Sequence, residues 1–405
     1  MAAINAEQVY KVFGRNAKDG VERLQAGATR EDLQTSGQAA AVIDASFTVE
    51  EGETFVVMGL SGSGKSTLIR MVNGLLEPTS GSMKIYGQDI TTMSQKGVRQ
   101  LRRERISMVF QHFALFPHRT VLENAAYGLE TQGVRKAERR EKASEALELC
   151  GLTGWEDHLP SQLSGGMRQR VGLARALAAE TDVMLMDEAF SALDPLIRRE
   201  MQDQLVELQR RLSKTILFIT HDLNEAMRLG DRIAMMRDGR IVQIGTAAEI
   251  LNEPANDYVA QFIQDVDRTR VLTASAVMEN PVAVLASDQT PRAAQELLRA
   301  HGLSALFVVD RQNALCGAVY EEEVAAAVLT GEEHLTAILD SSVTTIAPNT
   351  KLADLFGEAA RCRAALPVVG DCNRLLGVIP RITLLNALAR GSTAEALTEE
   401  TEVAS

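Results

Sequence analysis

Four short apolar segments stand out in the first half of the chain, and polar positions follow each of them directly. They are TFVVMGL at 54–60, ISMVFQ at 106–111, DVMLMDE at 182–188 and TILFITHD at 215–222. Short, nearly unbroken apolar runs of this kind are typical of strands buried on both faces. Because helical patterns lie between them, the chain is predicted to form a largely parallel α/β sheet.

Three other stretches depart from this alternation. In RIAMMRDGRIVQIG at 232–245, two apolar runs flank Asp238-Gly239, which predicts a β-hairpin. Residues 112–175 contain no good strand and are predicted to form a helical insert. The segment at 252–270, NEPANDYVAQFIQDVDRTR, is predicted to lead out of the domain.

Beyond residue 270 the chain repeats itself. ALFVVDRQNALCGAV at 305–319 aligns with ALPVVGDCNRLLGVI at 365–379 at a shift of 60 residues, with seven identities. An extended stretch and a helical pattern precede each copy, and a second helical pattern follows it. We therefore predict two small β-α-β-type modules that stack and share a core.

Length, charge and cysteine content limit the class of protein. The chain has 405 residues, enough for two or three domains, and a net charge of −12, which argues against nucleic acid or an anionic membrane as the main partner. No apolar run approaches the roughly 20 residues of a membrane-spanning helix, and the start lacks a signal-peptide pattern. Four scattered cysteines predict unpaired thiols in a reducing cytoplasm.

The C-terminal region is acidic. Residues 266–405 hold 11 Lys and Arg against 18 Asp and Glu, and the last thirteen residues (393–405) hold four Glu and no basic residue. This tail is predicted to be disordered.

The segment GLSGSGKST at 59–67 matches the phosphate-binding pattern G-x-x-x-x-G-K-[ST]. It follows a predicted strand and opens a predicted helix, which is the context that the pattern requires. Glycines let backbone amides curl around phosphate, the helix N-terminus adds positive potential, and Lys65 reaches the terminal phosphates. The predicted ATP contacts in this loop are Gly59, Ser61, Gly62, Ser63, Gly64, Lys65, Ser66 and Thr67, with the Ser66 hydroxyl also a Mg²⁺ ligand.

Polar side chains follow three other predicted strands. Asp187 is placed to hold Mg²⁺, and Glu188 to orient or deprotonate the attacking water. His221 is predicted to contact the γ-phosphate, and Gln111 to join the Mg²⁺ and water shell. Nearer the N-terminus, Phe13 is a candidate for stacking on adenine, although spacing alone would favour a core residue.

A second loop, LSGGMRQR at 163–170, also has the features of an anion site. A serine, two glycines and a helix N-terminus provide a hydroxyl, bare amides and positive potential. Together with the phosphate loop and the strand-end Asp, Glu, Gln and His, it occurs in an order that resembles the ATP-binding-cassette (ABC) ATPases over about residues 5–250. The resemblance implies a head-to-tail dimer in which one chain caps the nucleotide of the other. The residues assigned to that role are Leu163, Ser164, Gly165, Gly166, Gln169 and Asp194.

Longer segments narrow the resemblance. MGLSGSGKSTLIRMVNGLLEPTSG, MVFQHFALFPHRTVLENAAYGLE and LMDEAFSALDPLIRREMQDQL are similar to the ATPase subunits of glycine betaine/proline betaine importers. An insert at about 14–41 and a C-terminal pair similar to cystathionine-β-synthase (CBS) modules agree with this. Within the insert, TREDLQTSG predicts a short helix with Thr29 and Asp32 as a capping box and Gly37 as its stop.

The CBS-like copies depart from the pattern G-x-x-T-x-x-D that nucleotide-binding members show. The first copy has Gly317, Tyr320 and Glu323, and the second has Gly377, Pro380 and Thr383, at the positions of the pattern's Gly, Thr and Asp. We therefore expect packing or ionic-strength sensing from this pair, rather than binding of an adenosine-type ligand.

The predicted protein is thus an α/β P-loop ABC ATPase with a helical subdomain, followed by a tandem α+β CBS pair. The predicted limits are 1–265 for the ATPase, 273–330 and 333–392 for the repeats, and 393–405 for the tail. The resemblance implies an ATP- and Mg²⁺-dependent subunit, peripheral on the cytoplasmic face of the inner membrane, that powers osmoprotectant import. Its implied partners are a membrane permease, a second copy of itself and, indirectly, a solute-binding protein. The alternatives are an importer ATPase for another small polar solute and a soluble ABC ATPase without a transport role.

Overall fold

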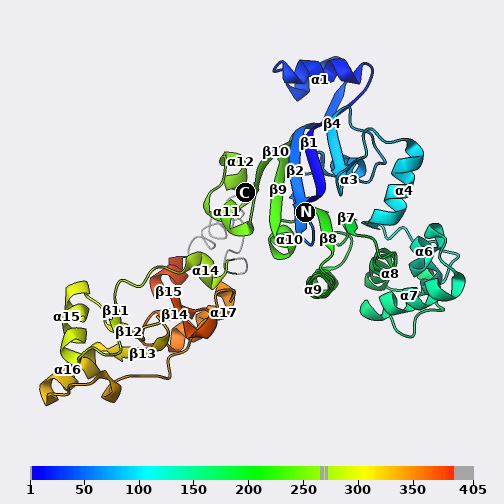
Figure 1. The fold of residues 1–405 in the computed structure, drawn as a ribbon. Helices are drawn as coiled ribbons and strands as arrows, with labels where there is room; N and C mark the ends of the chain where they lie inside the picture. Colours follow the sequence, from blue (N-terminus) through cyan, green and yellow to red (C-terminus); the bar gives the residue numbers. More distant parts are fainter. Residues whose placement is uncertain (1, 265–268, 270–271, 387–405) are drawn as a thin grey trace, which may run out of the picture. The chain divides into compact units, whose positions relative to one another are not determined.

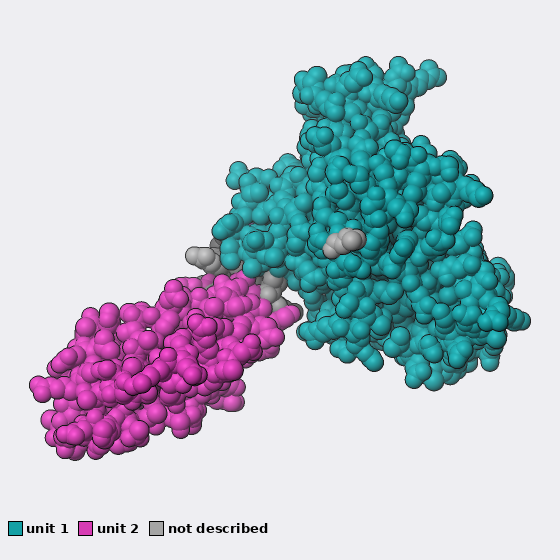
Figure 2. Space-filling model, viewed as in Figure 1, with its two compact units in different colours: residues 1–261 teal, residues 262–405 magenta. Residues whose placement is uncertain are grey.

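The computed structural model describes residues 2–264, 269 and 272–386 (Figure 1). The chain divides into two compact units, residues 1–261 and 262–405, which Figure 2 colours separately. The predicted tail at 393–405 lies outside the described residues. Among the described residues, no helix is long and apolar enough to cross a membrane.

A six-stranded sheet with the order β10-β9-β3-β8-β7-β6 forms the centre of the first unit. The four predicted strands are confirmed, and they pair in parallel with one another. The predicted hairpin is also confirmed, because β9 and β10 are antiparallel and turn at Asp238-Gly239. The strands are β3 (Thr54–Met58), β6 (Ile106–Phe110), β7 (Val183–Asp187), β8 (Thr215–Thr220), β9 (Arg232–Arg237) and β10 (Arg240–Gly245).

Helices connect and cover these strands, and short helices continue the chain after the hairpin (Figure 1). All five residues of β3 and all six of β8 are buried, which explains why every residue between their terminal positions is apolar. The helices are α3 (Lys65–Val72), α4 (Gln95–Arg105), α9 (Pro195–Leu212), α10 (Leu223–Leu229), α11 (Ala247–Asn252) and α12 (Asp257–Phe262).

A second, four-stranded antiparallel sheet with the order β2-β1-β4-β5 was not predicted from the sequence. Its two long strands carry several register shifts, and Gln8 and Asp44 have positive φ, so apolar positions do not alternate regularly along them. The sheet packs against the parallel sheet, and Phe47 stacks on Phe55 with ring centroids 5.5 Å apart. The strands are β1 (Ala2–Phe13), β2 (Ala39–Glu50), β4 (Ser80–Ile85) and β5 (Gln88–Asp89).

The predicted helical insert is confirmed, since residues 112–175 contain helices and no strand. In Figure 1 α6, α7 and α8 lie together beyond α4. Most of α8 is buried, in keeping with its apolar sequence VGLARALA. The elements are α5 (Val121–Ala125), α6 (Tyr127–Gln132), α7 (Lys136–Leu149), η1 (Pro160–Gln162) and α8 (Gly165–Ala178).

The segment between β1 and β2 folds into two short helices, α1 (Ala17–Gln25) and α2 (Arg30–Thr35). The predicted capping box is confirmed: Thr29 accepts from the Asp32 amide, and Asp32 accepts from the Thr29 amide. The helix ends before Gly37, which has φ +73°. Val21, Leu24 and Leu33 pack with residues of β1 and β2 in a small core of their own.

The second unit contains two related modules. In the first, β11 is parallel to β12, and β12 is antiparallel to β13; in the second, β14 and β15 form the equivalent antiparallel pair. The elements are α14 (Ala274–Val277), β11 (Val284–Ala286), α15 (Pro291–His301), β12 (Ala305–Val309), β13 (Leu315–Tyr320), α16 (Glu321–Thr330), η2 (Leu335–Ala337), α17 (Leu352–Arg361), β14 (Leu366–Val369), η3 (Asp371–Asn373) and β15 (Leu375–Ile379).

The predicted stacking of the two modules is confirmed. Phe307 and Leu315 of the first copy share a core with Leu375 and Val378 of the second. Two asparagines at equivalent positions join the modules reciprocally: Asn313 Nδ2 donates to the Leu375 carbonyl at 3.0 Å, and Asn373 Nδ2 to the Leu315 carbonyl at 2.7 Å. The sequence repeat therefore appears in space as a nearly symmetric pair.

Candidate functional site

The phosphate loop joins β3 to α3, and its glycines have conformations that other residues rarely adopt. Gly59, Gly62 and Gly64 have φ of +154°, +80° and +106°. A Cβ atom at Gly59 would lie 2.2 Å from the Met236 carbonyl oxygen, and one at Gly64 would lie 2.2 Å from the Ala41 carbonyl oxygen. The loop thus fits tightly against the adjacent strands and presents its backbone.

Lys65 is the first residue of α3 and is 4% exposed. Its Nζ donates to the carbonyl oxygens of Gly59 at 2.7 Å and Leu60 at 3.1 Å. Burial lowers the pKa of Lys65, and the nearby Glu188 and Asp187 carboxylates oppose that shift. A buried ammonium at a helix N-terminus fits a polyanionic ligand, which would compensate for its desolvation.

Ser63 supplies a further polar group in this loop. Its Oγ is buried, and no hydrogen-bond partner for it exists among the described residues.

Asp187, at the end of β7, faces the start of α3. Ser66 Oγ donates to Asp187 Oδ1 at 3.3 Å. Burial raises the pKa of Asp187, although the Ser66 hydrogen bond opposes this shift. A hydroxyl and one carboxylate are a donor set that fits Mg²⁺, which usually takes one or two carboxylates together with phosphate oxygens and water.

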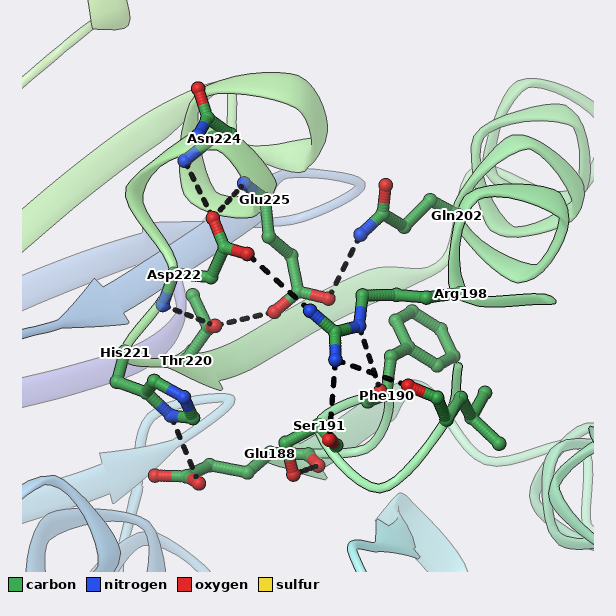
Figure 3. Close-up of polar contacts among 11 residues, drawn as sticks. Glu188, Phe190, Ser191, Arg198, Gln202, Thr220, His221, Asp222, Asn224 and Glu225 are labelled. Atoms are coloured by element: carbon green, nitrogen blue, oxygen red, sulfur yellow. Dashed lines mark hydrogen bonds and ion pairs between the residues drawn. The ribbon is translucent and has the colours of Figure 1, made fainter. Parts of the chain in front are cut away.

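Glu188 and His221 lie together at neighbouring strand ends (Figure 3). His221 Nδ1 is 3.2 Å from Glu188 Oε2, and Glu188 has a positive φ of 46°. The Glu188 amide donates to the Ile219 carbonyl at 3.0 Å, so the turn is held against β8. A carboxylate in contact with an imidazole can accept a proton from water and hold the imidazole in one orientation.

Gln111 points toward the same turn. Its Nε2 donates to Ser191 Oγ at 3.0 Å, and Ser191 Oγ donates to the Glu188 carbonyl at 2.9 Å. Sequence reasoning missed Ser191, whose only signal is its place three residues after Glu188.

Phe13, at the end of β1, is 41% exposed, so its ring is available for stacking. The Lys11 ammonium lies over the ring at 5.2 Å from its centroid. Sequence reasoning also missed Arg30 of α2, whose Nη2 donates to the Gly62 carbonyl of the phosphate loop at 3.3 Å. Nothing in the segment TREDL indicates this contact, because it depends on how the insert packs.

The second loop lies at the N-terminus of α8. Ser164 caps this helix, with its Oγ accepting from the Met167 amide at 3.3 Å. A Cβ atom at Gly165 would meet nothing within 4 Å, whereas one at Gly166 would lie 2.5 Å from Ile197 Cγ2. Within the described part of the chain, no hydrogen bond or ion pair joins Ser164 to the phosphate loop. The space beside Gly165 is open, because no atom lies within 4 Å of a Cβ placed there.

Gln169 and Asp194, which were assigned to the same role as Ser164, lie in different surroundings. Gln169 is fully buried and donates from Nε2 to the Phe110 carbonyl at 3.4 Å. Its side chain therefore faces the sheet instead of the surface that Ser164 occupies, because α8 packs this side against β6. Asp194 is exposed and caps α9 by accepting from the Ile197 amide at 3.1 Å. Leu163 is buried at 6% exposure.

The structure thus brings the phosphate loop, Asp187, Glu188, His221 and Gln111 together at the carboxyl ends of the parallel strands. Among the described residues, no cluster of three or more His, Cys, Asp or Glu could hold a metal alone.

Comparisons with known proteins match segments in both units of the chain. The family model for ABC transporters matches residues 42–191, and the model for CBS domains matches residues 274–330 and 335–390. The glycine betaine transport ATP-binding protein OpuAA of Bacillus subtilis is 49% identical, over 98% of this chain and 96% of its own length. The glycine betaine/proline betaine transport system ATP-binding protein ProV of Escherichia coli is 46% identical, over 96% of this chain and 98% of its own.

Among solved structures, the dimeric post-hydrolysis state of an ATP-binding cassette, bound to ADP and phosphate, is similar to this chain. It is 30% identical with a TM-score of 0.51, and the match covers 60% of this chain and 98% of that one.

Proposed function

The chain belongs to the family of ATP-binding subunits of ABC transporters that also carry CBS domains, and on that premise we propose that it powers import of a quaternary-ammonium osmoprotectant. Glycine betaine, proline betaine and choline are the solutes of this class. The observation that carries the proposal is the extent of the likeness to OpuAA and ProV, whose names specify betaines and which match the ATPase and the CBS pair alike.

The chain binds ATP through the loop at 59–67. Lys65 and the N-terminus of α3 supply positive charge for the phosphates, and the glycines leave the backbone amides accessible. Ser66 and Asp187 would hold Mg²⁺, which supplies charge neutralisation on the phosphates when bound. Phe13, exposed at the end of β1, would stack on the adenine ring.

Hydrolysis requires a group that polarises the attacking water. Glu188 is the candidate base, and His221, within 3.2 Å of it, is the candidate contact to the transferring phosphoryl group. Gln111 approaches the same turn through Ser191 and would join the Mg²⁺ and water shell.

Two copies of the chain would form a head-to-tail dimer. The amides at the N-terminus of α8, with Ser164 and Gly165, form an anion site. In the proposal, this site binds no phosphate of the nucleotide held by the same chain. In the proposed dimer, this site and Asp194 cover the nucleotide held by the partner's phosphate loop. Closure on ATP and reopening after hydrolysis would then drive a separate membrane permease, with the chain at the cytoplasmic face of the inner membrane and a solute-binding protein on the other side.

The CBS pair would regulate the ATPase without binding an adenosine-type ligand. Arg363 of the second copy stacks on Tyr320 of the first, with its Cζ 4.2 Å from the ring centroid, and its Nη1 lies 2.7 Å from Glu323 Oε1. Tyr320 and Glu323 stand at the positions of the ribose-binding Thr and Asp. Because both contact Arg363, they are not available to bind a ribose.

The test is reconstitution of the chain with the permease and solute-binding protein encoded beside it. We expect ATP-dependent uptake of labelled glycine betaine, proline betaine or choline, and its loss with Glu188→Gln. Uptake of another small polar solute, but of no quaternary amine, would make the chain an importer ATPase of different specificity. Failure to co-purify with any membrane protein would favour the soluble ATPase.

A further inference from the structure

One arginine side chain donates hydrogen bonds to three backbone carbonyls of the loop between β7 and α9. Arg198, in the first turns of α9, donates from Nε to the Phe190 carbonyl at 3.2 Å, and from Nη2 to the Ser191 and Leu193 carbonyls at 3.3 and 3.1 Å (Figure 3). This loop begins at Glu188 and ends at Asp194. Three carbonyls on one guanidinium hold its path firmly, because the donors have a fixed planar geometry.

The same guanidinium also reaches the turn that carries His221. Its Nη1 lies 3.7 Å from Asp222 Oδ2, and Asp222 directly follows His221. Asp222 is itself fixed, because its Oδ1 caps α10 by accepting from the Asn224 and Glu225 amides. Arg198 and Asp222 are 30% and 34% exposed, so water screens their attraction only partly.

A second, buried contact supports this turn from the same helix. Glu225, 4% exposed, accepts from Thr220 Oγ1 and from Gln202 Nε2, the latter at 3.1 Å. Thr220 Oγ1 in turn accepts from the Asp222 amide at 3.0 Å. Gln202 lies one helical turn after Arg198 on α9. This helix therefore contacts the segment after β8 twice, through Arg198 with Asp222 and through Gln202 with Glu225.

We propose that Arg198 is a positioning residue, which sets the separation of Glu188 and His221. Arg198 touches neither residue; it acts through the loop carbonyls and through Asp222. The inference rests on the proposed role of Glu188 in hydrolysis. Its physical basis is that Glu188 and His221 lie on separate strand ends, and a small displacement of reacting groups costs a large factor in rate.

The proposal predicts a split between catalysis and binding. Among the described residues, Arg198 contacts none of the phosphate loop, so its removal leaves ATP affinity unchanged. Arg198→Ala in the full-length chain is expected to lower kcat by about 10- to 100-fold and to change KM for ATP by less than about twofold. Arg198→Lys keeps the charge near Asp222 but donates from a single nitrogen, which cannot span the carbonyls that Nε and Nη2 of Arg198 reach, so it should restore kcat only in part.

The matched control is Arg199→Ala. This neighbour on α9 is exposed and makes none of these contacts, so kcat and KM should stay at wild-type values. Circular dichroism and thermal unfolding report whether each variant is folded. If Arg198→Ala does not fold, Arg198→Lys carries the test. A kcat that falls only in proportion to the folded fraction, or a raised KM with unchanged kcat, overturns the proposal.

A double-mutant cycle locates the effect. Asp222→Asn keeps an oxygen to cap α10 but removes the charge that faces Arg198. The double variant should lose less than the product of the two single losses, because both changes remove one interaction. Fully multiplicative losses contradict the Arg198–Asp222 link. If wild type hydrolyses ATP and Glu188→Gln is equally active, the proposed function of Glu188 fails instead, which separates the two failures.

Discussion

At the scale of single residues, the site depends on where charge is buried. Lys65 and Asp187 are both withdrawn from solvent, and burial shifts their pKa values in the directions that disfavour charge. Each would be stabilised by the opposite charge of an incoming Mg²⁺–ATP complex. Glu188 faces His221 at the rim of the site, and its side chain is 21% exposed, so a water molecule can reach it.

The first residue-scale prediction concerns Glu188. Glu188→Gln preserves size but removes the proton acceptor, so we expect ATP binding to persist while hydrolysis falls by about 10²- to 10⁴-fold. The variant should also accumulate as a closed dimer with ATP, measured by size-exclusion chromatography with light scattering. Near-normal turnover in the purified variant would rule out this role.

The second concerns Phe13, whose ring is 41% exposed. Stacking of a base on an aromatic ring is worth about 1–3 kcal/mol, so Phe13→Ala should weaken ATP binding by roughly 5- to 150-fold without changing kcat at saturation. Phe13→Tyr keeps the ring and serves as the control. Equal affinity of wild type and the alanine variant for a fluorescent ATP analogue would make Phe13 a packing residue only.

At the scale of elements, three helix N-termini contribute to the proposed nucleotide site. The N-terminus of α3 adjoins the phosphate loop, the N-terminus of α8 is the proposed second anion site, and Asp194 caps the N-terminus of α9. Each is a place where unpaired amides and the helix dipole favour negative charge. Only the first adjoins the phosphate loop of its own chain.

The element-scale prediction tests whether the other site acts between chains. Ser164→Ala and Lys65→Ala should each abolish ATP-dependent dimer formation by the variant alone. A mixture should recover part of it, because one composite site of the heterodimer keeps both side chains. The measurement is the dimer fraction with ATP in the Glu188→Gln background. A mixture that forms no more dimer than either variant by itself would contradict a role in trans.

At the scale of the whole molecule, the question is how the second unit acts on the first. Residues 266–405 carry 11 basic and 18 acidic residues, so an attraction to anionic lipid would need a basic face. Arg361, Arg363, Arg374 and Arg381 are the candidates. Arg363 is paired with Glu323, and Arg381 donates to the Ala359 and Cys362 carbonyls. Arg361 also lies 3.9 Å from Glu358, but it is 81% exposed, so Arg361 and the exposed Arg374 are the more accessible pair.

The whole-molecule prediction is that truncation after Gln264 removes salt regulation. We expect the complete transporter, reconstituted with anionic lipid, to be silent at low salt and to be activated as the Debye length shrinks from about 30 Å at 0.01 M to about 8 Å at 0.15 M. The truncated transporter should be active throughout. If it is still silent at low salt and activated over the same range, the CBS pair is not the switch.

Much of this molecule can be read directly from the chain, because the signals are local. Buried parallel strands are short apolar runs, and their carboxyl ends meet at one edge of a sheet. The amino-acid sequence alone therefore places Asp187, Glu188, His221 and Gln111 together. The capping box of Thr29 and Asp32 and the turn at Asp238-Gly239 are likewise set by neighbours within a few residues.

Contacts between distant segments could not be read in this way. The antiparallel sheet was missed because bulges interrupt the alternation along β1 and β2. Gln169 was expected beside Ser164, but the packing of α8 against β6 turns it inward. Arg198 and Asp222 are 24 positions apart, and they meet only because α9 lies beside the turn after β8. Local sequence specifies which elements form and where their polar ends lie, whereas the packing of those elements determines which side chains hold the ends in place.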